Sequence, residues 1–133
     1  MRLLKRIATI GATLLVVTAG AATASYADPD DPDYIPPYYE SEIEGSYARF
    51  IRLGDKFEAC DTAYDWQLAY VQYQYVRIDG SVQTGKHYVP SDAGDCQTWD
   101  HNFGEKRYVW FRACVDEPLT ASDPCAPWRQ GLA

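Results

Sequence analysis

Short segments of alternating apolar and polar residues, each bounded by turn residues, recur about every ten positions over residues 46–133. Successive side chains of a β-strand point to opposite faces, so this period of two predicts strands that each bury one face. No run in this region repeats apolar residues at helical spacing over three turns. The pattern predicts an all-β fold: a small disulfide-stapled sandwich, Ig-like or jelly-roll-like, of about six or seven antiparallel strands.

Turn residues delimit six candidate strands, at 47–52, 56–61, 67–78, 81–89, 96–101 and 106–116. The dipeptide Asp79-Gly80 suits a two-residue hairpin turn between the third and fourth of them. Alternation along the third and the last predicts this core face: Ala69, Val71, Tyr73, Tyr75, Val109, Phe111, Ala113 and Val115. We expect the proline-rich stretch 118–127 to be a terminal loop that leads to Trp128.

The chain has four cysteines, all in this region: Cys60, Cys96, Cys114 and Cys125. An even number in a short exported chain indicates disulfides, whereas a zinc site usually needs two close Cys-x-x-Cys pairs. We favour Cys60–Cys96, which joins two strand ends, with Cys114–Cys125, which closes a short loop that contains proline. A crossed pairing that ties Cys60 to the last predicted strand is the alternative.

The N-terminus has the features of a secretory signal peptide. Arg2, Lys5 and Arg6 precede an uncharged, largely apolar stretch that ends in small residues at Ala24 and Ala27. We expect residues 1–27 to be removed after Ala27, with Ala24 as the other site, and the protein to be secreted. An uncleaved membrane anchor is the competing interpretation.

Residues 28–45 contain seven acidic residues, four prolines and no basic residue. This composition predicts a flexible acidic arm, rich in proline and tyrosine, ahead of a sandwich domain at 46–133. A polyproline-like recognition segment around Pro36-Pro37 is the alternative interpretation. The whole chain has 12 basic and 19 acidic residues, a net charge of −7, which argues against nucleic acid and anionic membrane surfaces as partners.

The sequence carries no nucleophile motif, and we expect no catalytic residues, no metal and no cofactor. The two histidines, His87 and His101, are expected to be exposed polar residues on hairpins. A small hydrolase would need a carboxylate pair, for which these residues are the candidates: Asp61, Asp65, Asp100 and Glu105.

An outward row of aromatic residues is the strongest candidate for a binding site. If the core face is assigned correctly, these residues point outward: Tyr70, Tyr108, Trp110 and Arg112. Rings flanked by amides and arginine form a protein-contact patch or a sugar-stacking platform. A third interpretation is an outer face that arginine stems partly cover. We expect a monomeric module that binds an extracellular protein, and a carbohydrate-binding or cell-wall-binding module is the alternative.

Four short motifs follow one another along the chain: Gly54-Asp-x-Phe57-x-x-Cys60-Asp61, Cys96-x-x-Trp99, Phe111-Arg112-x-Cys114-Val115-Asp116 and Cys125-Ala-x-Trp128-x-x-Gly131. In this order the chain resembles a group of small secreted two-disulfide proteins from high-GC filamentous Gram-positive bacteria. That resemblance implies export, a β-rich domain and two bridges, and no catalytic residues. In size, export and disulfide count the chain is also similar to the subtilisin-inhibitor family, whose reactive loop would correspond to residues 115–123.

Overall fold

The computed structural model describes residue 30, residues 32–90 and residues 94–133, so the predicted signal peptide lies outside the described residues. Within these ranges the chain forms strands and no helix. The eight strands of the described part are β1 (Tyr38–Ile43), β2 (Ser46–Ile51), β3 (Lys56–Asp61), β4 (Leu68–Val76), β5 (Val82–Tyr88), β6 (Cys96–Asp100), β7 (Tyr108–Asp116) and β8 (Arg129–Leu132).

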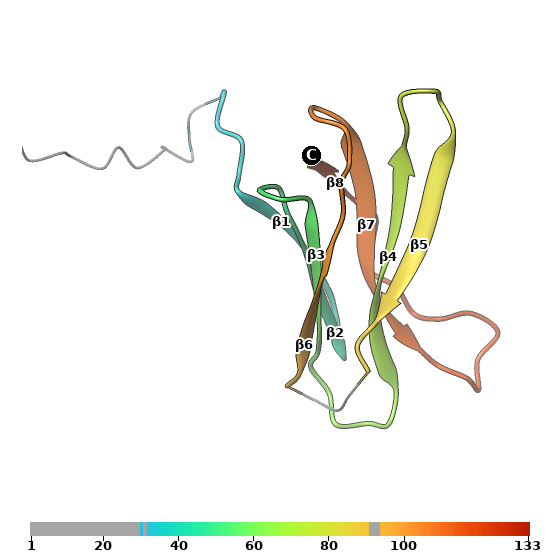
Figure 1. Ribbon diagram of the computed structural model, residues 1–133. Coiled ribbons are helices and arrows are strands. Elements are labelled where there is room, and N and C mark those ends of the chain that lie inside the picture. The colour runs from blue at the N-terminus through green and yellow to red at the C-terminus, as the bar shows by residue number, and fades with distance from the viewer. Residues whose placement is uncertain (1–29, 31, 91–93) are drawn as a thin grey trace, which may run out of the picture.

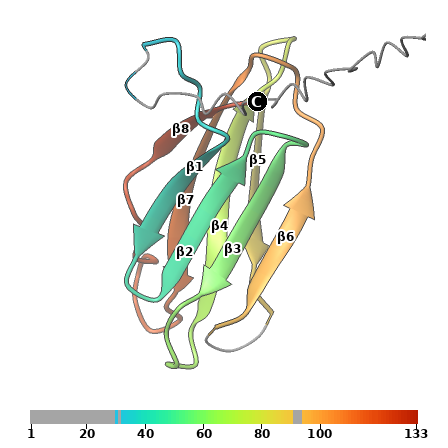
Figure 2. The same cartoon turned by 90° about the vertical axis from the view of Figure 1, so that its left-hand side faces the viewer.

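The strands form two antiparallel sheets, with orders β1-β2-β3-β6 and β5-β4-β7-β8. Figure 1 shows the two sheets side by side, and Figure 2 looks onto the first with the second behind it. The expected disulfide-stabilised β-sandwich is therefore confirmed.

The six predicted strands correspond to β2–β7, and the segment 56–61 coincides with β3. The expected count of about six or seven strands was too low by one or two, because β1 and β8 lie in regions that were assigned as non-strand. β8 has only four residues and follows a proline-rich stretch, so its period of two is too short to recognise.

The predicted arm at 28–45 is wrong in its C-terminal part, because β1 is the edge strand of the first sheet. It pairs with β2 from Tyr38 opposite Ile51 to Ile43 opposite Ser46. All four prolines of the segment precede Tyr38, so nothing removes a backbone donor from this ladder. Tyr39 and Ile43 pack against the core, and the first strand of the domain begins at Tyr38 rather than after residue 45.

The predicted core face is correct, since each of its residues on β4 and β7 is buried. The other sheet contributes Phe50 and Phe57, whose ring centroids lie 5.2 Å apart. Phe57 also stacks on Tyr73 of the opposite sheet at 4.9 Å. Aromatic contacts of this kind join the two sheets across the sandwich.

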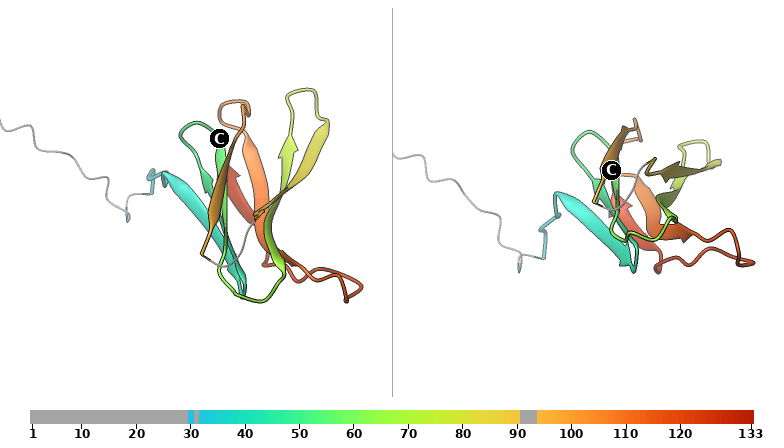
Figure 3. Two further views of the ribbon diagram at one scale, coloured as in Figure 1. Left: turned by 60° about the horizontal axis from the view of Figure 1, so that its bottom comes forward. Right: turned by 90° about the horizontal axis from the view of Figure 1, so that it is seen from below.

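Both preferred disulfides are present, Cys60–Cys96 and Cys114–Cys125. Cys60 and Cys96 are opposite each other in the β3–β6 register, so the bridge ties an edge strand to its neighbour. The second bridge fastens the β7–β8 connection (117–128) to β7. Both connections 62–67 and 117–128 lie at the same end of the sandwich (Figure 3). The described residues contain no helix that could cross a membrane, and two disulfides fit an oxidising extracellular environment.

Candidate functional site

The outer face of the β5-β4-β7-β8 sheet presents a group of aromatic side chains. Tyr108 is 54% exposed and Trp128, just before β8, is 37% exposed, while Trp110 is half-buried. Trp110 lies opposite Gln74 in the β4–β7 register. The ring centroids of Tyr108 and Trp110 are 6.1 Å apart, and their planes are inclined by 53°. Of the residues predicted to point outward, Tyr108 and Trp110 do so.

Arg112 also points outward, and two contacts hold its guanidinium group in place. Its Cζ lies 4.4 Å from the centroid of the Trp128 ring, within cation–π range. Its Nε donates a hydrogen bond to Oε1 of Gln72, the residue opposite it on β4, at 2.9 Å. The arginine therefore links β7 to the Trp128 ring in one conformation.

A shallow apolar hollow of about 380 Å³ opens between the two tryptophans. Its lining consists of Gln74, Val76, Val82, Trp110 and Trp128. Val82 is 57% exposed although it is aliphatic, so this part of the sheet leaves apolar surface in contact with water. We name the outer-face surface formed by Tyr108, Trp110, Arg112, Trp128 and this hollow the tryptophan face.

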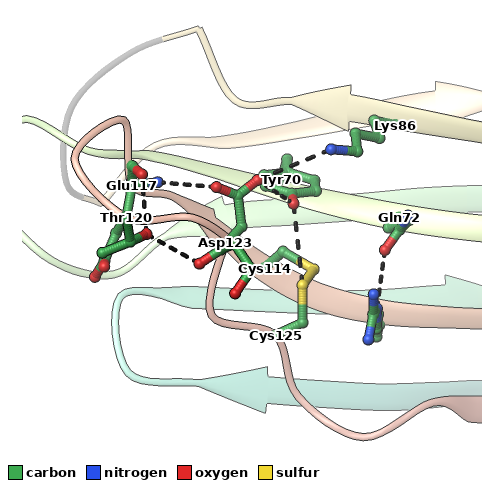
Figure 4. Close-up of polar contacts among 10 residues, drawn as sticks. Tyr70, Gln72, Lys86, Cys114, Glu117, Thr120, Asp123 and Cys125 are labelled. Carbon is green, nitrogen blue, oxygen red and sulfur yellow. Dashed lines mark hydrogen bonds and ion pairs between the residues drawn. A yellow bond between two sulfur atoms is a disulfide. The ribbon is translucent and has the colours of Figure 1, made fainter.

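Tyr70 does not belong to the tryptophan face, because it is only 1% exposed, contrary to the sequence prediction. Its ring packs against Tyr88 at 4.7 Å between centroids, and the Lys86 ammonium lies 4.8 Å from its centroid. Its hydroxyl donates a hydrogen bond to the Asp123 carboxylate at 2.7 Å (Figure 4). Alternation assigned the correct side of the sheet, but the connection 117–128 folds back and covers that position.

Asp123 is the polar centre of this connection, as Figure 4 shows. Its Oδ1 accepts a hydrogen bond from the Glu117 backbone amide at 3.2 Å. Its Oδ2, which accepts the Tyr70 hydrogen bond, lies 3.8 Å from the Lys86 ammonium. Burial, followed by the bond to this carboxylate, raises the pKa of Tyr70. The connection is thus fastened by the disulfide and by Asp123, while Leu119 near its tip is 98% exposed.

Replacing Tyr70 by phenylalanine is expected to lower the free energy of unfolding by about 1.5 kcal/mol, because it removes a buried hydrogen bond to a charged group. Urea unfolding of Tyr70→Phe measures the loss. Tyr88→Phe, which changes the adjacent ring, is the control and is expected to stay within about 0.5 kcal/mol of the parent. Equal losses in the two variants would contradict a specific contribution of the Tyr70–Asp123 bond.

The two histidines are not exposed hairpin residues, as the sequence suggested, but form a half-buried pair. The Nε2 atoms of His87, on β5, and His101, one residue after β6, are 2.8 Å apart. His87 stacks on Trp99 at 4.8 Å and His101 stacks on Phe103 at 4.8 Å. Burial lowers the pKa of both imidazoles; the neighbouring imidazole also lowers that of His87, and nearby Asp55 and Asp100 partly offset the lowering at His101.

The alternation of side chains along each strand indicates that both histidines point inward. His87 lies between Gly85 and Val89 at the same phase, and His101 lies between Trp99 and Phe103. Nothing in the sequence indicates that the two imidazoles meet. They are 14 residues apart and come from edge strands of different sheets.

A cavity of about 750 Å³ lies at the opposite end from the connection 117–128. Its wall includes Tyr34, Arg52, Asp55, His101 and Glu105. Asp55 accepts a hydrogen bond from the Phe103 backbone amide at 2.8 Å, and burial raises the pKa of its carboxyl. Of the four carboxylates considered for a hydrolase, Glu105 alone lines this cavity.

The other three carboxylates make local structural contacts. Asp61 is buried and accepts a hydrogen bond from the Ala63 backbone amide, and Asp65 accepts one from the Gln67 backbone amide. Asp100 forms an ion pair with Lys56 at 3.5 Å. Capping a turn or pairing with a cation is a sufficient physical role for each of them.

The connection 62–67 exposes two further rings at the end shared with residues 117–128. Tyr64 is 75% exposed and Trp66 is 87% exposed, with their centroids 6.2 Å apart. Trp66 has a φ of 64°, a conformation that costs free energy for a bulky residue. Sequence periodicity missed these rings because they belong to a turn rather than to a strand.

Among the described residues, no three His, Cys, Asp or Glu side chains cluster closely enough to hold a metal ion. No protein-family model, curated protein or solved structure matches this chain. The function is therefore argued from the chain's own geometry.

Proposed function

We propose that this chain is a secreted, non-enzymatic module that binds another extracellular protein through the tryptophan face. The 53° inclination between the Tyr108 and Trp110 rings carries the proposal. Sugar platforms require exposed rings close to one plane, because each sugar ring stacks flat on its partner. Protein-contact surfaces instead combine differently oriented rings with arginine.

The fixed position of Arg112 supports the same conclusion. Tryptophan, tyrosine and arginine are the residues most enriched among those that dominate binding energy at protein interfaces. An arginine already held by Trp128 and Gln72 loses little conformational entropy when a partner binds. The tryptophan face is therefore preorganised for a protein contact.

The two sheets differ in the charge of their strands. The four strands of this sheet carry three basic residues, Lys86, Arg112 and Arg129, and one acidic residue, Asp116. The strands of the other sheet carry two basic and five acidic residues, and the whole chain has a net charge of −7. The second sheet is thus less acidic than the first. Of its basic side chains, Arg112 lies on the tryptophan face, whereas Arg129 shares the inward side of β8 with Gly131 and Lys86 pairs with Asp123. Arg112 is therefore the group on this face that can meet a carboxylate of a partner.

Secretion is part of the proposal and rests on two sequence features. Residues 1–27 combine a basic start, an apolar centre and small residues before the expected cleavage site at Ala27. The disulfides Cys60–Cys96 and Cys114–Cys125 persist in an oxidising compartment.

The test is capture of a protein partner from the culture medium of the organism that encodes this chain. The parent protein is expected to retain a partner that Trp110→Ala binds about 30-fold more weakly, the effect of losing a dominant contact residue of about 2 kcal/mol. Tyr38→Ala changes an exposed ring on the outer face of the other sheet and is expected to retain the partner fully. Equal capture by the two variants would contradict the assignment of the face.

A carbohydrate-binding module is the second candidate, favoured by the hollow between Trp110 and Trp128 with the Gln74 amide at its wall. Its test uses columns of cellulose, chitin and peptidoglycan. Retention of the parent protein combined with loss of retention in Trp110→Ala would establish this candidate and overturn the protein-binding proposal.

A further inference from the structure

One side of the sandwich is closed by side chains. The sheet orders place β5 and β6 at the ends of different sheets, and the strand pairing within the described residues includes no β5–β6 ladder. Side chains from these two edges meet instead. His87 of β5 contacts Trp99 of β6 and His101, whose backbone amide donates a hydrogen bond to the Asp55 carbonyl at 3.0 Å.

The two imidazoles meet end to end. Their centroids are 5.0 Å apart while the Nε2 atoms are 2.8 Å apart, so each Nε2 points toward the other ring. An N–H···N hydrogen bond needs one donor and one acceptor, which two neutral rings of opposite tautomer provide. A pair that carries a single added proton also provides them. Two protonated rings would bring two N–H donors and two positive charges to 2.8 Å.

The surroundings supply little to offset a second charge. His87 and His101 both contact Phe57 of β3 and Tyr73 of β4, whose phenol is the titratable group facing them from that strand. Next to His101, Asp55 is engaged with the Phe103 amide.

Two of the remaining charged groups near the pair already have partners of opposite charge: Asp100 pairs with Lys56, and Lys86 pairs with Asp123 on the outer face. Glu105 lies close enough to Asp55 to raise the pKa of the Asp55 carboxyl. The pair therefore lies in an aromatic enclosure with carboxylates on the His101 side alone.

We propose that the His87–His101 pair is an acid-sensitive latch between the two sheets. The latch is closed while the pair holds at most one added proton, and the second proton breaks the Nε2–Nε2 contact and releases β5 from β6. Release exposes the free edges of both strands and widens the cavity that His101 lines. This inference does not depend on the tryptophan face.

The direction of the pH dependence follows from proton linkage. Burial holds both pKa values below the ordinary histidine value of about 6.5, so the opened state binds more protons than the closed state below that pH. The equilibrium constant for release of β5 from β6, here called the opening constant, is expected to be independent of pH above about pH 7.5. At lower pH it rises by up to about tenfold per pH unit for the one proton that the closed pair excludes.

The test is NMR of the oxidised protein from pH 7.5 to 4.5, with each histidine titration followed alongside amide hydrogen exchange. The protection factors of the β5 and β6 amides, which compare the observed exchange rate with the intrinsic rate at the same pH, are expected to fall as the second proton binds. Protection retained while both imidazoles are charged would overturn the latch. This measurement needs no substitution, so it decides the question even where a variant folds poorly.

The double variant His87→Gln/His101→Gln keeps polar side chains at both positions but removes the titration. The opening constant of β5 and β6 in this variant is expected to lose the rise of up to about tenfold per pH unit between pH 7 and 5. Thr84→Gln, on the outer face of β5, is the matched control and is expected to keep it. A pH dependence unchanged in the double variant would refute the assignment to these histidines.

Discussion

Replacing both Cys60 and Cys96 by alanine is expected to lower the free energy of unfolding by about 4 kcal/mol. This bridge spans 36 positions, and a cross-link removes more freedom from the unfolded chain when its loop is longer. The same substitution at Cys114 and Cys125, which are 11 positions apart, is expected to cost about 3 kcal/mol. Either loss is a large part of the 5–15 kcal/mol that stabilises a typical small domain.

Urea unfolding of the two double variants beside the parent measures these losses. Thr98→Ala, an exposed substitution on β6, controls for changes on that strand and is expected to stay within about 0.5 kcal/mol of the parent. A loss below about 1 kcal/mol for the Cys60/Cys96 variant would show that native-state strain cancels the loop-closure effect. The Cys114/Cys125 variant is also expected to expose Tyr70, because the connection 117–128 would lose its covalent attachment.

Gly85→Ala is expected to destabilise the protein by about 2–3 kcal/mol, although it adds one methyl group. Gly85 lies opposite Tyr73 in the β4–β5 register, and the tyrosine ring covers the space where a side chain would be. A Cβ at position 85 would lie 2.5 Å from each of three atoms of that side chain, two ring carbons and the phenolic oxygen. Tyr73 cannot move freely, because it packs against Phe57 and the histidine pair.

Thermal unfolding of Gly85→Ala measures the effect, and a double-mutant cycle with Tyr73→Leu tests its cause. Leucine lacks the ring atoms that a Cβ at position 85 would meet, so Gly85→Ala is expected to cost less than about 1 kcal/mol in that background. A cost that stays the same with leucine at position 73 would place the effect in the backbone of β5 rather than in the ring contact.

Several elements of the fold could be predicted from local pattern alone. Alternation identified β2–β7 and the inward face of β4 and β7, because a period of two is a property of each strand by itself. The pairing of the cysteines followed from their positions near strand ends and around a short loop. β1 was missed because its acidic residues, Glu40 and Glu42, resemble the preceding arm, although they occupy the outer face of the strand.

The candidate site, like the fold, has parts that local sequence pattern predicts and parts that it does not. The outward direction of Tyr108, Trp110 and Arg112 was predictable from their phase on β7. The burial of Tyr70 was not, since a distant segment covers it and its partner Asp123 is 53 positions away. Trp128 joins the tryptophan face through Arg112, a contact that sequence periodicity does not encode.

Strand periodicity, turn residues, cysteine count and charge were sufficient to determine an all-β, disulfide-bonded and acidic protein, because each depends on a residue and its near neighbours. The two features with the clearest functional meaning required the assembled sandwich. Trp128 meets β7 only after the last connection folds back, and His87 meets His101 only because two edge strands of different sheets come together. Contacts between residues far apart in sequence depend on how the sheets pack, and local patterns carry no information about that packing.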